Sequence, residues 1–117
     1  LNLASGPREA SQDPATAWLF LVGSLREVLD HAREHDVVVT VEPEPGHLVA
    51  TLADFDRLSD EVGGDLPLCL DVSHVSVEAD EGTPEAAIEA YAHRLALALA
   101  SGQELRAWGS AKRQSAP

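Results

Sequence analysis

Two carboxylates in this sequence, Glu42 and Asp71, each follow directly on a run of mostly apolar residues, at positions 37–41 and 66–70. An apolar run that stops at a charged side chain is typical of a buried parallel strand that presents this side chain at its C-terminal end. Parallel α/β folds gather their functional groups at that edge of the sheet. The two carboxylates are 29 residues apart, the length of one strand–helix–strand unit, so neighbouring strands are expected to present them side by side.

A histidine, His74, follows Asp71 by three residues and completes a set of ligands suited to a divalent cation. In a continuing strand His74 points away from Asp71, whereas a turn after Asp71 brings both side chains to one site. A buried carboxylate without a partner is costly, so these acidic groups need a cation or several hydrogen-bond donors. Glu42, Asp71 and His74 are therefore the candidate metal ligands. In the simpler interpretations Glu42 is a solvated residue at the strand exit, Asp71 caps a turn and His74 is a loop histidine.

Other polar residues near these strand ends are candidates for the rim of a pocket. Glu44 lies between two prolines that stiffen the turn and is expected to shape the rim. His47 lies in the loop above Glu42 and is a candidate for contact with substrate, and Ser5 is a second rim candidate. The remaining histidines have polar neighbours at helical positions and are expected on the surface: His31, His35 and His93.

The composition limits the classes of partner. The chain has 117 residues, enough for one small domain, and its 20 Asp and Glu against 8 Lys and Arg give a formal net charge of −12. This acidity argues against nucleic acid and against anionic membranes as partners. No apolar stretch reaches the roughly 18 residues of a membrane span. The single cysteine, Cys69, is expected to be a small buried side chain, and a disulfide framework is excluded, which indicates a reducing, cytoplasmic setting.

Strands and helices alternate along the sequence, which predicts an α/β fold with a parallel sheet. Apolar runs predict a short strand stopped by Gly6 and Pro7, and further strands at residues 37–42 and 66–71. Cap residues and helical periodicity predict helices at residues 14–35 and 52–62, and a third that starts at Pro84, includes Leu95 and Leu99 and stops near Gly102. Residues 103–108 are expected to add one turn, and the C-terminal residues from about Gly102 to be poorly ordered.

Side-chain alternation assigns the two faces of the predicted sheet. A uniformly apolar face that suits packing against helices is predicted for five residues: Val37, Val39, Val41, Leu68 and Leu70. The other face is mixed, and suits a barrel interior with the carboxylates in its top layer. In an open piece of a barrel this face loses its opposite wall, so three of its residues are expected to be partly exposed: Val38, Thr40 and Cys69.

These residues make the sequence similar to the xylose-isomerase-like TIM barrels, the sugar phosphate isomerase/epimerase superfamily that also includes endonuclease IV. Residues 39–42 and 70–74 resemble strands five and six of that family, and residues 5–7 with Trp18 resemble strand four and its helix. A (β/α)₈ barrel needs about 250 residues, so the resemblance implies a fragment, roughly strands four to six, over residues 1–101. Residues 102–117 form a separate tail, and nothing after Arg94 resembles strand seven with its histidine or strand eight with its glutamate.

The resemblance implies that Glu42 and Asp71 bind a divalent cation, Mn, Mg, Co or Zn, weakly in this chain. His74 joins the metal or holds a substrate hydroxyl, and Glu42 also moves a proton beside the carbonyl of a sugar or sugar phosphate. A small-molecule sugar or similar polyol is thus the implied partner. The open sheet edges lead us to expect self-association.

Two other interpretations stay open. The first is a non-catalytic, truncated half-barrel. The second is phosphodiester cleavage of the endonuclease IV type, which implies a trinuclear zinc site with more histidines and a surface that accepts DNA. The acidity of the chain and the few histidines at the strand ends count against the second.

Overall fold

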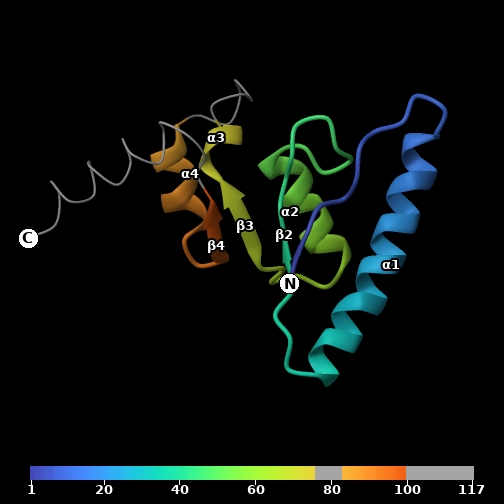
Figure 1. The fold of residues 1–117 in the computed structure, drawn as a ribbon, viewed down its shortest axis with the longest axis horizontal. Coiled ribbons are helices and arrows are strands. Elements are labelled where there is room, and N and C mark those ends of the chain that lie inside the picture. The colour runs from blue at the N-terminus through green and yellow to red at the C-terminus, as the bar shows by residue number, and fades with distance from the viewer. Residues whose placement is uncertain (76–82, 100–117) are drawn as a thin grey trace, which may run out of the picture.

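The computed structural model describes residues 1–75 and 83–99 and arranges them as a parallel sheet with intervening helices (Figure 1). The strands are β1 (Asn2–Leu3), β2 (Thr40–Val41), β3 (Leu68–Asp71) and β4 (Leu95–Leu99), in the order β1-β2-β3-β4. The helices are α1 (Pro14–Glu34), α2 (Leu52–Glu61), α3 (Val72–Val75) and α4 (Pro84–Tyr91). Each strand pairs in parallel with the next in sequence, which confirms the predicted α/β class and matches a fragment of a TIM barrel.

Local capping signals start the helices where the sequence predicts. Asp13 accepts hydrogen bonds from both the amide and the hydroxyl of Thr16, so α1 begins at the proline that follows. Thr51 and Asp54 form a reciprocal capping box at the start of α2. Gly64 has a φ of 85° and its amide donates to the Ser59 carbonyl, which ends α2 as expected.

The hydrophobic core lies between the helices and one face of the sheet. Val41, Leu68 and Leu70 belong to one buried cluster with residues of α1 and α2, as side-chain alternation predicts. The helical members that fill most of this space are Trp18, Val22, Leu25, Phe55 and Leu58.

The mixed face is less exposed than expected. Val38 is 61% exposed, as predicted, but Thr40 and Cys69 are only 5% and 0% exposed. The expected exposure of Thr40 and Cys69 is wrong, because neighbouring polar side chains contact both residues. Asn2 of β1 accepts a hydrogen bond from the Thr40 hydroxyl and donates one to Glu42, and Cys69 lies against the same carboxylate.

Two strands are shorter than predicted because pairing sets their limits. β2 is restricted to the residues that pair with Asn2 and Leu3 of β1, so residues 37–39 precede the strand. β3 begins at Leu68 because Pro67 has no amide hydrogen to donate. The amide of Leu66 donates to the Ser59 hydroxyl instead of to a strand.

The largest correction concerns residues 92–99, which were expected to continue the third helix. α4 ends at Tyr91, and residues 95–99 form β4 beside β3. Leucine and alanine are strong helix formers, but their strict alternation has the two-residue period of a strand. The Arg94 carbonyl accepts the Leu68 amide, and the Arg94 guanidinium lies 2.9 Å from Asp56 of α2, which fixes the turn before β4. The expected helix stop at Gly102, the turn at 103–108 and the tail lie outside the described residues.

None of the helices within residues 1–75 and 83–99 is sufficiently long and apolar to span a membrane. The loops and turns that leave the C-terminal ends of β2 and β3 lie at the top of the view in Figure 1, whereas α1 ends at the bottom. Groups at these two places are therefore at opposite ends of the molecule.

Candidate metal centre

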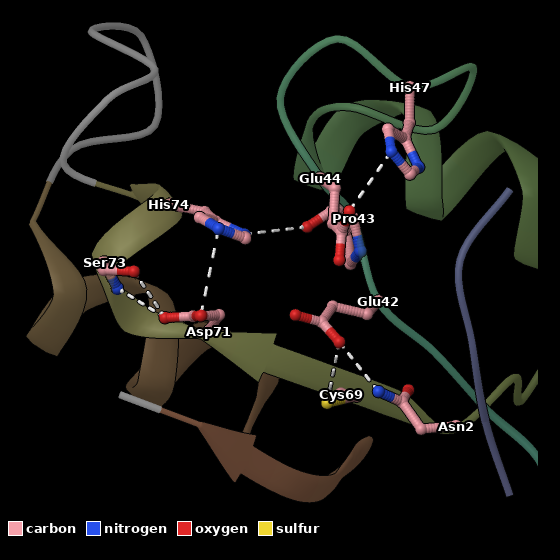
Figure 2. Close-up of polar contacts among 9 residues, drawn as sticks. All are labelled: Asn2, Glu42, Pro43, Glu44, His47, Cys69, Asp71, Ser73 and His74. Atoms are coloured by element: carbon pink, nitrogen blue, oxygen red, sulfur yellow. Dashed lines mark hydrogen bonds and ion pairs between the residues drawn. The ribbon is translucent and has the colours of Figure 1, made fainter. Parts of the chain in front are cut away.

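Three side chains meet at the C-terminal edge of the sheet. Glu42 directly follows β2, Asp71 ends β3 and His74 lies in α3. One ligand atom from each lies within 4.8 Å of the others, and Figure 2 shows all three side chains around a common space. The expected juxtaposition of the two carboxylates is confirmed. We refer to these three residues as the strand-end centre.

Glu42 is held by one of its two carboxylate oxygens. Its Oε2 accepts a hydrogen bond of 2.7 Å from the Asn2 side-chain amide and lies 3.8 Å from the Cys69 thiol. The second oxygen is directed into the space between Asp71 and His74 (Figure 2). The side chain is thus fixed in orientation, with one oxygen left for a ligand.

Asp71 is held in the same way. The amide and hydroxyl of Ser73 donate to its Oδ1 at 3.0 and 2.6 Å. Its Oδ2 lies 3.8 Å from His74 Nε2. The turn-cap interpretation and the ligand interpretation are therefore compatible, because each uses a different oxygen of this carboxylate.

His74 owes its position to α3. This single helical turn directly follows β3, so it brings His74 back beside Asp71, as the sequence predicts for a turn at this point. His74 Nδ1 lies 3.4 Å from the Pro43 carbonyl oxygen. Donation from Nδ1 to that carbonyl leaves Nε2 with its lone pair facing the centre. Metal-binding histidines are commonly oriented by such a hydrogen bond.

The donor set fits a divalent cation. Glu42 is only 7% exposed, and within the described residues no Lys, Arg or His forms an ion pair with it. Two carboxylates therefore face each other with a single imidazole between them, and a bound cation would offset their repulsion. Two oxygen donors and one nitrogen donor suit Mn²⁺, Mg²⁺, Co²⁺ or Zn²⁺.

The neighbouring thiol stays protonated. Burial, together with the adjacent Glu42 carboxylate, raises the pKa of Cys69 to about 11. A neutral thiol is a weak hydrogen-bond donor, so Cys69 supports Glu42 and does not compete with it as an anionic ligand. This agrees with the expectation of a small buried side chain.

The other predicted rim residues lie outside the three-residue cluster. His47 Nε2 lies 3.2 Å from Glu44 Oε2, so these two loop side chains pair with each other (Figure 2). Ser5 accepts a hydrogen bond from the Val49 amide and thereby anchors the loop that follows β2. His31, His35 and His93 are exposed, as expected, but His35 is the C-terminal cap of α1 and His93 lies in the turn after α4, so neither is on a helix.

Sequence reasoning missed Asn2. Its amide orients Glu42, and its side-chain oxygen accepts from Thr40. The signal was a single amide between two leucines in the first apolar run. Its use depends on the register of β1 against β2, which places Asn2 opposite Thr40.

The family model described as xylose isomerase-like TIM barrel matches residues 1–103. The chain therefore belongs to the xylose isomerase-like TIM barrel family. Comparison with curated proteins and with solved structures gave no significant match.

Proposed function

We propose that this chain carries the metal-binding part of a sugar or sugar phosphate isomerase/epimerase-like site. The observation that supports it is the shared orientation of the strand-end centre. Glu42, Asp71 and His74 each have one polar atom held by the protein and another facing the same space. That preorganisation is what a metal site requires of its surroundings, and family membership supports the reaction class.

A divalent cation bound there would polarise the carbonyl or hydroxyl oxygen of a sugar. Glu42 would be both a ligand of the cation and the base that takes the proton from the carbon next to that carbonyl. In an isomerase it would return this proton to the carbonyl carbon, while the proton of the adjacent hydroxyl passes to the former carbonyl oxygen. The burial of Glu42 keeps water from competing for this proton. Asn2 and Cys69 hold the carboxylate against the sheet, so its other oxygen stays directed into the space between Asp71 and His74.

His74 and His47 are assigned to substrate contact. His74 lies half-buried on the open side of the centre, where its Nε2 reaches either the cation or a substrate hydroxyl. His47 with Glu44 forms a polar pair in the loop above β2, and its Nδ1 is buried without a hydrogen-bond partner in the structure. This nitrogen is available to a hydroxyl or phosphate oxygen of a bound sugar if the loop moves.

Phosphodiester cleavage of the endonuclease IV type is the weaker candidate. The family covers both activities, but the formal charge of −12 opposes approach of DNA. Within residues 1–75 and 83–99, the strand-end centre has one histidine only.

Exchange of hydrogen at a sugar carbon tests the proposed activity. The chain is incubated with Mn²⁺ and a panel of aldoses, ketoses and their phosphates in deuterium oxide. Proton NMR then measures loss of signal at the carbon beside the carbonyl. We expect slow exchange that is lost in Glu42→Gln, because the amide cannot accept the proton.

Calorimetry with Mn²⁺ separates binding from chemistry. Weak binding that is reduced further in Glu42→Gln and Asp71→Asn supports the centre. Tight binding unaffected by both substitutions would exclude it. Manganese binding at this centre without exchange in any sugar would instead favour a non-catalytic half-barrel.

A further inference from the structure

A second group of metal-ligating side chains lies at the far end of α1. His31, Glu34 and His35 each offer one ligand atom, and these atoms all lie within 4.8 Å of one another. We refer to these three residues as the helix-end cluster. His31 lies in the last turn of α1 and His35 is its C-terminal cap, and their ring centroids lie 4.6 Å apart.

The backbone orients one of the two rings. His35 Nδ1 lies 2.8 Å from the His31 carbonyl oxygen, so Nδ1 carries the hydrogen and donates it to the helix. The lone pair of His35 then sits on Nε2, which is free to bind a cation. His31 Nδ1 lies 3.8 Å from Glu34 Oε2, which brings the carboxylate to the same face.

The surroundings favour a cation. The C-terminal end of a helix carries partial negative charge, and α1 has 21 residues of aligned peptide dipoles. The cation of the last turn, Arg33, is already paired with Asp30 at 2.9 Å. On one side the cluster borders an open hollow of about 790 Å³, lined by apolar side chains that include Leu1, Val28 and Val37.

We propose that His31, Glu34 and His35 form a zinc site at the C-terminal end of α1, independent of the strand-end centre. Two imidazoles and one carboxylate favour Zn²⁺ over Mg²⁺ and Mn²⁺, which prefer oxygen ligands. Ligands of a tetrahedral Zn²⁺ lie about 3.4 Å apart for bonds of about 2.05 Å. Rotation of these exposed side chains closes the remaining distance, and water completes the coordination. The bound ion ties the last turn of α1 to its C-terminal cap.

Zinc titration of four variants tests the site. Calorimetry is performed in a Glu42→Gln/Asp71→Asn background, which removes both carboxylates of the strand-end centre. We expect one Zn²⁺ per chain, and at least about tenfold weaker binding in His31→Asn and in His35→Asn. Glu34→Gln should weaken it less. The matched control is His93→Asn, which removes an exposed histidine that belongs to neither group.

Imidazole NMR of the unsubstituted chain provides a second measurement, independent of that background. Zinc should shift the ¹⁵N resonances of His31 and His35, with ligation at Nε2 of His35. Equal zinc affinity in His31→Asn, His35→Asn and the His93→Asn control would overturn the proposal. So would half an equivalent of Zn²⁺ per chain, because it indicates an ion shared between two copies.

Discussion

The strand-end centre and the helix-end cluster use the same kinds of side chain in opposite settings. Glu42 is 7% exposed, whereas the side chains of His31 and Glu34 are 77% and 72% exposed. In the strand-end centre each ligand is fixed by a neighbour from another element, such as Asn2 on Glu42. In the helix-end cluster the candidate ligands come from the last turn of α1 and its C-terminal cap, and the ring of His35 is held by the His31 carbonyl.

The two groups of residues differ in which parts of the fold fix their geometry. The strand-end centre exists only once β1, β2 and β3 are paired, so its geometry depends on the fold. The helix-end cluster depends only on α1, because residues four apart in sequence share a helix face. Substitutions far from the strand-end centre can therefore distort it, whereas the helix-end cluster responds only to substitutions in its own turn.

The largest expected effect comes from the buried thiol of the strand-end centre. The pKa of Cys69 is raised in the fold from 9.0 to about 11, so the folded chain holds a proton that the unfolded chain loses. Stability is therefore full below about pH 9 and falls as pH rises toward about 11, by about 2 to 3 kcal/mol in total. Chemical denaturation at successive pH values measures it. Cys69→Ala should remove this part of the pH dependence, and an unchanged slope would contradict the burial of the thiol beside Glu42.

The next effect is stabilisation by manganese. At ten times its dissociation constant, Mn²⁺ should raise the free energy of unfolding by about 1.4 kcal/mol. The rise should persist in His35→Asn and vanish in Asp71→Asn, because only the latter removes a carboxylate from the strand-end centre. Thermal melts with and without Mn²⁺ provide the test. The reverse pattern would mean that manganese binds at the helix-end cluster.

A smaller effect is expected from Asn2. Asn2→Ala removes the amide that donates to Glu42, which should lower stability by about 1 kcal/mol and weaken Mn²⁺ binding by about tenfold. Calorimetry and denaturation of one preparation measure both quantities. Asn2→Asp is a more severe test of this contact, because it places a negative charge beside Glu42. If Asn2→Ala binds Mn²⁺ as tightly as the unsubstituted chain, Asn2 does not orient the carboxylate.

The smallest effect is expected at the helix-end cluster without metal. His31→Asn and His35→Asn should each change stability by no more than about 0.5 kcal/mol, because both side chains are exposed. Denaturation in the presence of a chelator measures this. A loss above about 1 kcal/mol, twice the range expected for surface substitutions, would indicate that the rings support the fold directly.

The sequence identified the strand-end centre because its signals are local. Apolar runs that end in Glu42 and Asp71 need no knowledge of the rest of the chain, and the turn that returns His74 follows directly on the second run. The caps Asp13 and Thr51 are local in the same sense, so both helix starts were predicted.

The predictions that were wrong or missing concern features that depend on contacts between residues far apart in the sequence. The sequence predicts helix at β4 because leucine and alanine have high helix propensity, whereas the pairing of Leu68 with Leu95 makes this segment a strand. The role of Asn2 requires the register of β1 against β2. Burial of Thr40 and Cys69 follows from the same polar contacts across strands.

The order of the strands bears on how the chain acquires its structure. Because β1, β2, β3 and β4 lie in the sheet in the order in which they occur in the sequence, every strand pairs with the one made just before it. Each closure spans one helix, or two between β3 and β4, so the entropy lost in bringing partners together stays small at every step. During synthesis, a newly emerged strand finds its neighbour already exposed as an edge. The fold can therefore grow from the ribosome one unit at a time, and the strand-end centre forms as soon as residues 68–74 reach the edge of β2.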